Sequence, residues 1–368
     1  MNDALLKKLY EDYKAPYGLG SSSKLYKEAK RINKKISHDE VKNFLKGNFV
    51  YTLHYPARRY WLRNRVIVSK PHEQAQMDLC DMTSLKNYNS GVNYLLTFID
   101  CFSKFSIVKT LYTKSQQEVS SALDEILRNY YVEKLQSDRG KEFINSMVRK
   151  VAEKNGTYLF FTHNQDIKCS IVERFNRSLK SRMFKYFTMN GTRRYVDVLQ
   201  KLVDAYNNSI HRSIRMAPSR VKMSDTSAIF KRLFPGFKNE HDLRSYIAQQ
   251  DISKTKFKIG SLVRIKYYLN VMEHRFLPNY SDQIYRVTSI VKGYPRYRYR
   301  LSHLDKEEKL LRSFYEEELE EVRNNEYRIK VIDSRIRKGK KEYLIHFIGH
   351  DKSEDEWRSQ SSIRELGA

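Results

Sequence analysis

Residues 76–82 read Gln-Met-Asp-Leu-Cys-Asp-Met, a short run in which Asp78 lies between the apolar Met77 and Leu79. Such a run is typical of a buried strand, whose successive side chains point to opposite faces of a sheet. Asp78 and Asp81 therefore face opposite ways, and only one of them can face a given site. Burying a carboxylate without a partner is costly. We expect Asp78 to face a cation and Asp81 to be a turn residue at the strand end.

Two further carboxylates complete the pattern. Asp138 follows the strand-like run at 132–137, and Glu173 comes 35 positions later, on a predicted helix. Two acids at strand ends and one on a helix can converge on a pair of divalent cations, which clamp the attacking and leaving oxygens of a phosphodiester. Two nearby acids have simpler roles. Asp100 is expected to be a turn or cap residue, and Glu142 to begin a helix, where a carboxylate suits the dipole.

The composition points to a nucleic-acid partner. Among 368 residues, 69 Lys and Arg stand against 43 Asp and Glu, a net charge of +26 that attracts a polyanion. No run approaches the roughly 20 apolar residues that span a bilayer, and the start lacks a secretory signal. Only three cysteines occur, with no Cys-x-x-Cys pair. We expect an intracellular protein that is neither secreted nor membrane-bound and has no disulfide scaffold.

Hydrophobic periodicity predicts a multidomain chain. The core should contain strands at 76–82, 94–100, 105–111, 132–137 and 158–162 and helices at 116–130, 142–154, from 170 and at 195–209. This order predicts an α/β, ribonuclease-H-like core, a mixed five-stranded sheet with helices on both faces. The predicted segments are a helical N-terminal DNA-binding region (1–66), the core (67–225), a linker (226–255), a small β-barrel (256–323) and a last unit of three short strands (325–367).

Local patterns add detail to these segments. Ser37 to Glu40 form a capping-box pattern that opens a helix. The arginine-rich stretch 56–65 either tracks DNA or is a solvated connector. Residues 294–300 alternate aromatic and basic residues, as on a nucleic-acid surface, and the acidic block 316–321 is expected to be a solvated boundary. The polar loop 163–168 is expected to flex over the site.

The predicted helix that carries Glu173 has two faces. Arg177 and Lys180 follow Glu173 at i+4 and i+7 and share its face, which predicts phosphate-binding cations beside a metal ligand. The alternative is an ordinary surface with a Glu–Arg pair. DNA contacts are predicted for Arg58, Arg59, Arg63, Arg65, Lys168, Arg174, Asn176, Arg177, Lys180, Arg296 and Arg298.

The stretches 137–143, 172–180 and 206–218 resemble the motifs of retroviral-type integrases. Residues 51–54, 63–68, 76–82 and 313–319 are similar to integrases of Maverick/Polinton self-synthesising transposons and of virophages. The resemblance implies a DDE-type polynucleotidyl transferase in which Asp78, Asp138 and Glu173 are the catalytic acids and bind two Mg²⁺ or Mn²⁺ ions. It implies 3′-end processing and strand transfer of double-stranded element ends into target DNA, and a barrel of the Src-homology-3-like type.

The same resemblance implies a homo-oligomer, with a tetramer expected, acting in the host nucleus, a viral particle or a viral factory. Retroviral integrases carry an N-terminal His-His-Cys-Cys zinc module, but here no cysteine precedes Cys80. No zinc is therefore predicted. Two alternatives stay open: a nuclease that only hydrolyses, and a domesticated DNA- and chromatin-binding protein without catalysis.

The last unit resembles a chromodomain in the stretches 326–335, 343–349 and 353–357. Chromodomains hold methyl-lysine in a cage of three aromatic rings, because a quaternary ammonium is attracted to π faces. Tyr327 matches the first cage position, Phe347 replaces the usual Trp, and His350 stands where a Tyr is common. The resemblance implies binding of histone tails or chromatin. The alternative is a DNA- or protein-binding module with a vestigial cage. Trp357 is expected in the core.

Overall fold

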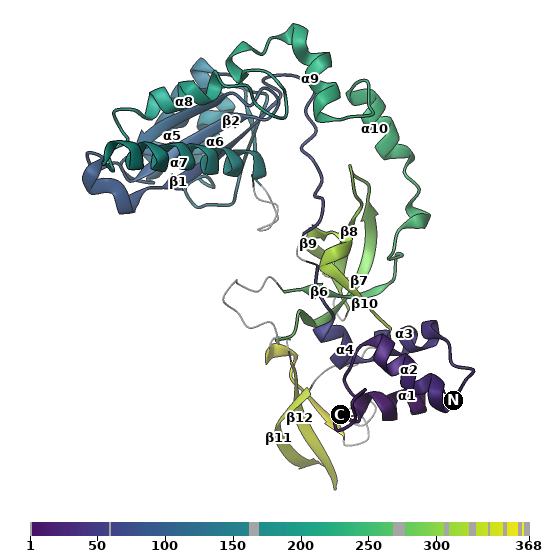
Figure 1. Cartoon of the computed structure of the whole chain (residues 1–368). Coiled ribbons are helices and arrows are strands. Elements are labelled where there is room, and N and C mark those ends of the chain that lie inside the picture. The colour runs from purple at the N-terminus through teal and green to yellow at the C-terminus, as the bar shows by residue number, and fades with distance from the viewer. Residues whose placement is uncertain are drawn as a thin grey trace. The chain divides into compact units, whose positions relative to one another are not determined.

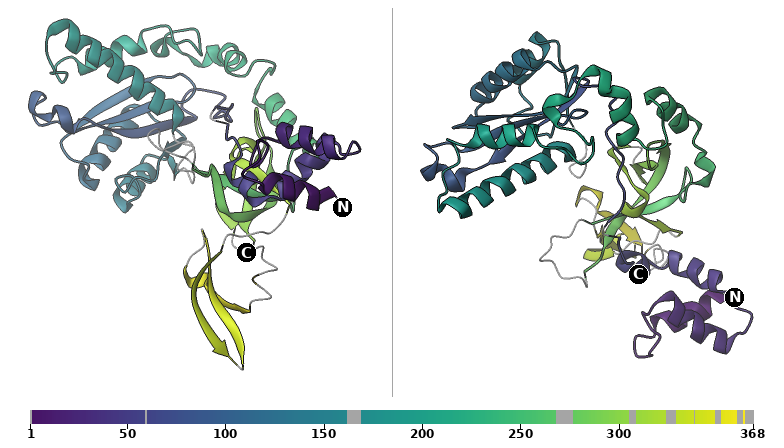
Figure 2. Two further views of the ribbon diagram at one scale, coloured as in Figure 1. Left: turned by 60° about the horizontal axis from the view of Figure 1, so that its bottom comes forward. Right: turned by 45° about the horizontal axis from the view of Figure 1, so that its top comes forward.

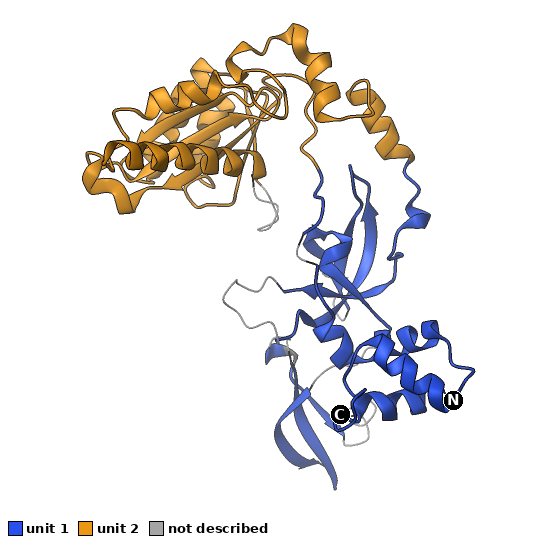
Figure 3. Cartoon of the chain, viewed as in Figure 1, with its two compact units in different colours: residues 1–64, 250–368 blue, residues 65–249 orange. Residues whose placement is uncertain are grey.

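The chain folds into two compact units (Figure 3). The computed structural model describes residues 2–58, 60–161, 169–267, 277–304, 309–323, 329–337, 339–348, 352–359 and 363. Residues 65–249 form one unit, here called the core unit. Residues 1–64 and 250–368 form the other, the terminal unit, which is therefore built from both ends of the chain.

The core unit is organised around a mixed five-stranded sheet, as predicted. Its strands are β1 (Gln74–Asp81), β2 (Tyr94–Asp100), β3 (Ser106–Leu111), β4 (Lys134–Ser137) and β5 (Tyr158–Phe161), in the order β3-β2-β1-β4-β5. The first three strands form an antiparallel meander, whereas β4 pairs with β1, and β5 with β4, in parallel. The central position of β1 places Asp78 in the middle of the sheet.

Helices cover both faces of this sheet (Figures 1 and 2). They are α5 (Gln116–Asn129), α6 (Ser146–Lys154), α7 (Ser170–Asn190) and α8 (Leu199–Asn207). On β1, Met77 packs in the cluster with α5 and α6, whereas Cys80 packs in the cluster with α7 and α8. Because side chains alternate along a strand, Asp78 shares the α7 face with Cys80. The ribonuclease-H-like α/β fold is thus confirmed.

Some predicted boundaries were wrong. The helix predicted from residue 142 begins at Ser146, because Asn145 caps it by accepting a hydrogen bond from the Val148 N–H (2.9 Å). The helix predicted over 195–209 begins at Leu199. The predicted linker was expected to contain local helices, and it contains α9 (Thr226–Leu233) and α10 (Glu240–Gln249). No helix of the described ranges is long and apolar enough to cross a membrane.

The N-terminal part of the terminal unit is helical only to His54. Its helices are α1 (Asn2–Glu11), α2 (Ser22–Ile32), α3 (His38–Gly47) and α4 (Phe49–His54). The capping box at α3 is confirmed: the Ser37 hydroxyl accepts from the Glu40 N–H, and the Glu40 carboxylate accepts from the Ser37 N–H. The described residues between α4 and β1 form no helix, so the predicted helical character was wrong there. Pro56, which lacks an N–H, follows directly after α4.

Two small sheets make up the rest of the terminal unit. The five-stranded sheet has the order β10-β6-β7-β8-β9 and is formed by β6 (Leu262–Lys266), β7 (Tyr280–Val291), β8 (Arg298–His303), β9 (Lys309–Phe314) and β10 (Leu319–Val322). The three-stranded sheet has the order β11-β12-β13 and is formed by β11 (Ile329–Arg337), β12 (Lys340–Phe347) and β13 (Glu356–Ser359). Strands of both predicted β modules are therefore present.

The acidic block at 316–321 is not the solvated boundary that was predicted. Glu317, Glu318 and Glu320 are buried in and beside β10. Arg296 forms an ion pair with Glu317, and Arg312 forms one with Glu318. A buried charge is tolerated where an opposite charge and hydrogen bonds satisfy it. The run of acids is thus part of the internal pairing of the five-stranded sheet.

The N-terminal helices pack directly on this sheet. The Arg264 side chain on β6 is only 1% exposed. It donates to the Thr52 hydroxyl on α4 (3.2 Å) and to the Ser281 carbonyl on β7 (2.9 Å). Lys46 on α3 forms an ion pair of 2.6 Å with Glu321 on β10. These contacts, here called the helix–sheet interface, join the two ends of the chain into one unit.

One carboxyl near this interface makes the terminal unit sensitive to pH. Burial raises the pKa of Glu320 to about 7, an effect that Glu321 reinforces and that Lys256 and Lys46 oppose. The folded pKa lies above that of an unfolded glutamate, so the stabilisation is complete below about pH 4.5 and is lost as the pH rises through 7. The loss amounts to at most about 3 kcal/mol, since one pKa unit corresponds to about 1.4 kcal/mol.

We therefore expect Glu320→Gln to raise the free energy of unfolding of the terminal unit at pH 8, with little effect at pH 5. The two tryptophans, Trp61 and Trp357, both lie in the terminal unit, so urea unfolding followed by tryptophan fluorescence reports on it selectively. Glu316→Gln, in the same segment but half-buried, is the matched control. An equal gain at both pH values would contradict the assignment.

Candidate active site

Asp78 lies at the centre of the site, on β1. Its carboxylate accepts hydrogen bonds from the Leu79 N–H (2.8 Å) and from the side-chain amide of Asn176 on α7 (2.8 Å). The Thr97 hydroxyl on β2 donates to the Asp78 carbonyl (3.1 Å). The carboxylate is thus oriented by its own strand and by the helix that carries Glu173.

The three predicted acids lie in one electrostatic neighbourhood. The pKa of Asp78 is raised by burial and by the nearby charges of Asp138 and Glu142, although its hydrogen bonds oppose this shift. Cys169, the residue before α7, is buried, and its pKa is raised by burial and by Asp138, Asp78 and Glu173. One thiol therefore experiences the charge of all three acids. Gathering like charges in this way is unfavourable unless a cation offsets them.

Gln76 ties together the elements that carry these acids. Its side-chain oxygen accepts from the N–H groups of Ile171 (2.9 Å) and Val172 (3.2 Å) in the first turn of α7. Its amide nitrogen donates to the Gln136 side chain on β4 (2.9 Å). Cys169, at the N-cap position, makes no capping hydrogen bond of its own. A side chain from β1 thus caps α7 and holds β4 at the same time.

Sequence reasoning missed this role of Gln76 and Gln136. A usable indication was present, because each glutamine stands two positions before a catalytic candidate, Asp78 or Asp138, on a predicted strand. Residues at i and i+2 of a strand share a face. A buried polar side chain on that face needs a hydrogen-bond partner. What the spacing could not show is that this partner is the start of a distant helix.

The donor chemistry of the acids fits a hard divalent cation, because Mg²⁺ and Mn²⁺ prefer carboxylate oxygens. The raised pKa of Asp78 beside Asp138 agrees with a site built to receive positive charge. Within the described ranges, however, no three His, Cys, Asp or Glu side chains are close enough to form a complete metal site. The acids are neighbours rather than an assembled ligand cage.

The structure agrees with the roles predicted for two rival acids. Asp81 accepts from the N–H and hydroxyl of Thr83, a local turn. Asp100 is fully buried and accepts from the N–H groups of Phe102 (2.8 Å) and Ser103 (2.7 Å). The prediction that Glu142 begins a helix was wrong, because α6 begins at Ser146. The charge of Glu142 contributes to the raised pKa of Asp78. Glu142 is a fourth carboxylate beside the site.

The cations predicted on α7 fall on two sides of the helix. Lys180 lies on the side of Glu173 and Asn176 and donates to the Asp81 carbonyl (3.4 Å). Arg174 and Arg177 line a cavity on another side. The amide of Asn176 is used on Asp78, whereas its side-chain oxygen is buried without a partner among the described residues. Lys168 lies outside the described residues, as does the loop 163–168.

The other predicted DNA contacts lie apart from the acids in sequence, and their role stays a prediction. Arg63 stacks on Trp61 (5.5 Å to the ring centre), and Arg65 donates to the Leu233 carbonyl. Arg296 is paired with Glu317. Three more positions complete the set. Arg58 is exposed, Arg298 on β8 is half-buried, and Arg59 lies outside the described residues.

Only one of the three residues proposed for the methyl-lysine cage lies among the described residues. Phe347 is half-buried on β12, whereas Tyr327 and His350 lie outside the described residues. Trp357 is half-buried rather than in the core as predicted, and Arg335 stacks on its ring at 4.1 Å. The guanidinium is itself held by Glu342 (2.8 Å). This ring face already has a cation on it.

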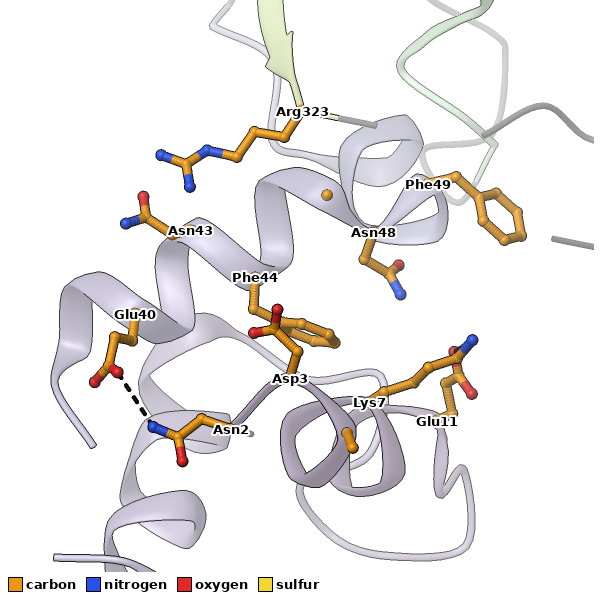
Figure 4. Close-up of a pocket in the computed structure, with 12 residues that line it drawn as sticks. Asn2, Asp3, Lys7, Glu11, Glu40, Asn43, Phe44, Asn48, Phe49 and Arg323 are labelled. Carbon is orange, nitrogen blue, oxygen red and sulfur yellow. Dashed lines mark hydrogen bonds and ion pairs between the residues drawn. The ribbon is translucent and has the colours of Figure 1, made fainter. Parts of the chain in front are cut away.

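A separate cavity of about 550 Å³ lies among the N-terminal helices (Figure 4). Its lining includes the carboxylates of Asp3 and Glu11 beside the cations Lys7 and Arg323. Glu40 at its edge accepts from the Asn2 amide (3.1 Å). Charges of both signs thus offset each other, and the cavity has no net preference for phosphate.

Gln76→Met tests the capping role, because methionine has a similar length but cannot accept from the two α7 N–H groups. Leaving buried donors unsatisfied costs about 1–3 kcal/mol, so we expect the free energy of unfolding of the core unit to fall by that amount. Gln74→Met is the matched control, since Gln74 also donates to Gln136 (3.0 Å) but is not bonded to α7. Equal losses in the two variants, in urea unfolding followed by circular dichroism, would count against the capping role.

Two stretches of the chain match models of known protein families. Residues 68–166 match the description of an integrase core domain, and residues 315–365 match that of the RNA binding activity-knot of a chromodomain, or Tudor-knot. The integrase core domain implies membership of the polynucleotidyl transferase superfamily.

The chain is also similar to two transposon proteins and to a chain from a viral intasome structure. A transposon-derived protein of Caenorhabditis elegans is 37% identical over 210 residues, which cover 56% of this chain and 67% of the relative. The transposon Ty1 Gag-Pol polyprotein of Saccharomyces cerevisiae is 32% identical over 98 residues, 25% of this chain but only 6% of that polyprotein. A chain of the simian T-cell lymphotropic virus intasome superposes with a TM-score of 0.56 at 14% identity, covering 83% of this chain and all of that one. The chain belongs to the transposon-derived proteins that carry a retroviral-type integrase core domain.

Proposed function

We propose that this protein is a DNA integrase that trims element ends and joins their 3′ hydroxyls to target DNA. The observation that carries the proposal is the shared electrostatic neighbourhood of Asp78, Asp138 and Glu173 beside the central strand of a ribonuclease-H-like sheet. The integrase core domain match supports it, and a net charge of +26 favours a polyanionic substrate.

The roles of the residues follow from their positions. Asp78, Asp138 and Glu173 would bind two Mg²⁺ or Mn²⁺ ions, which activate the attacking oxygen and stabilise the leaving oxygen of an in-line displacement. Asn176 holds the Asp78 carboxylate in place through its amide. Gln76 fixes the start of α7 against β1 and so keeps Glu173 near the other two acids. Lys180, bonded at the rim to the Asp81 carbonyl, would attract a DNA phosphate.

The type of element, the oligomeric state, the location and the chromatin partner are proposed from sequence resemblance. We propose that the element is of the Maverick/Polinton or virophage type and that the protein acts as a multimer, with a tetramer expected, on DNA in the host nucleus or a viral factory. The chromodomain-like region would direct it to chromatin or histone tails. The Tudor-knot match supports a chromodomain-like binding module there.

Asp138→Asn and Glu173→Gln test the catalytic assignment. Each replacement removes one carboxylate charge, so we expect at least a 100-fold loss of strand transfer, since even outer-shell changes at metal sites cost 10–100-fold. The assay joins labelled element-end oligonucleotides to a plasmid in Mg²⁺ or Mn²⁺. Lys201→Gln, on the exposed surface of α8, is the control. Full joining by either acid variant would refute the proposal, and cleavage without joining by the wild type would identify a nuclease that only hydrolyses.

Asn176→Ala tests the link between α7 and Asp78. Loss of the amide donor removes a contact that stabilises the charged carboxylate, so the already raised pKa of Asp78 should rise further. Below its pKa the carboxyl is protonated and cannot bind a cation. The acidic limb of the pH–rate profile should therefore move to higher pH. Ser178→Ala, whose hydroxyl bonds the Arg174 carbonyl instead, should leave the limb in place. A uniform rate loss with an unmoved limb would argue against this role.

A further inference from the structure

A second charged site lies on the core unit, between α7 and the segment that follows α8. It is a cavity of about 840 Å³. Six of its lining residues are cationic: Lys104, Arg174, Arg177, Arg182, Lys185 and Arg212. Among the described residues, no carboxylate lines it. We refer to it as the basic cavity.

The cations of the basic cavity are not held in ion pairs by the described residues. Elsewhere in the core unit, exposed arginines pair with acids, as Arg194 does with Asp197 and Arg128 with Asp124. Within the described part of the chain, none of the six cavity cations forms an ion pair. Arg182 donates to the Ser209 hydroxyl (3.1 Å) instead. Unpaired like charges repel one another, and an anionic ligand would relieve that repulsion.

The basic cavity also holds a buried lysine and a histidine whose pKa reflects the positive charge around it. Lys104 is 8% exposed, has a left-handed backbone (φ 64°) and donates to the Cys101 carbonyl. His211 is half-buried, and its pKa is lowered to about 4 by burial and by the charges of Lys104 and Arg174. The imidazole is therefore neutral near pH 7, and can both donate and accept a hydrogen bond.

Aromatic and apolar groups stand beside these cations. The half-buried ring of Tyr206 packs edge to face on the buried Phe175 (4.8 Å between centres) and lies 6.2 Å from the ring of His211. Ile210, also in the lining, is 78% exposed. Cations that follow a backbone, combined with rings and apolar surface for bases, are the chemistry with which proteins hold single nucleic-acid strands.

The basic cavity is distinct from the carboxylate site although both use α7. Arg174, Arg182 and Lys185 recur at helical spacing along one side of the helix, whereas Asn176 and Lys180 contact β1 on another. We propose that the basic cavity is a second DNA site, which binds the phosphates of a single strand while the carboxylate site acts elsewhere on the substrate. This proposal rests on the proposed function only in taking DNA as the ligand.

The test uses the full chain in EDTA, so that metal binding plays no part. Lys185→Glu/Arg212→Glu changes two exposed cavity cations, and Lys201→Glu/Arg220→Glu is a control of equal charge on exposed residues of the same unit outside the cavity. Affinity for a single-stranded oligonucleotide is measured against salt. Each phosphate contact adds about 0.7 to the magnitude of the log–log slope. We expect the magnitude of this slope to be about 1.4 smaller for the cavity variant than for the wild type, and the reduction to be clearly less for the control.

Circular dichroism confirms that both variants are folded before the slopes are compared. Equal slope changes in the cavity variant and the control would overturn the proposal. So would tripolyphosphate binding that depends on Lys185 and Arg212 while the oligonucleotide slope stays unchanged, because the cavity would then be a site for free polyphosphate. If the slope changes as expected but the wild type shows no strand transfer in Mg²⁺ or Mn²⁺, the DNA site stands and only the integrase proposal fails.

Discussion

The amide of Gln76 is the contact on which the arrangement of the acids depends. A helix that begins against the middle of a sheet presents unpaired N–H groups to a dry interior, where an unmet donor is costly. Gln76 meets two of them from β1 and uses its remaining donor on β4. A single neutral side chain therefore contacts all three elements: the strand with Asp78, the strand before Asp138 and the helix with Glu173. The acids themselves repel, and they need such a scaffold to remain close.

Much of the core unit could be predicted from the sequence because its rules are local. Alternation along β1 correctly predicted which face of the sheet Asp78 is on, and helical spacing correctly predicted that Lys180 lies on the side of Glu173. The predictions failed where distant segments decide the outcome. The acids of 316–321 look solvated in sequence, but Arg296 and Arg312, from other segments of the chain, pair with two of them inside the sheet. Gln76 reads as an ordinary strand residue until α7 is placed against it. Arg174 and Arg177, close to Glu173 in sequence, line a cavity that includes residues after α8.

The two sides of α7 divide the chemistry of the core unit between them. One side gathers negative charge that only a cation can offset, and the other gathers positive charge that only an anion can offset. The central helix keeps these opposite requirements apart, with an apolar stripe against the sheet. Such a division lets one helix respond both to metal ions and to nucleic acid.

The terminal unit is assembled from both ends of the chain, and the core unit is an insertion within it. The path from α4 through the core and back to β6 is therefore a loop closed by non-covalent contacts at Thr52, Arg264, Lys46 and Glu321. A folded insertion shortens that loop compared with an unfolded one, which raises the effective concentration at which the two ends meet. Loss of order in the core should thus loosen the helix–sheet interface. A truncation that removes the N-terminal helices should deprive the buried Arg264 guanidinium of one of its acceptors, Thr52, so the modules of this chain are not freely separable.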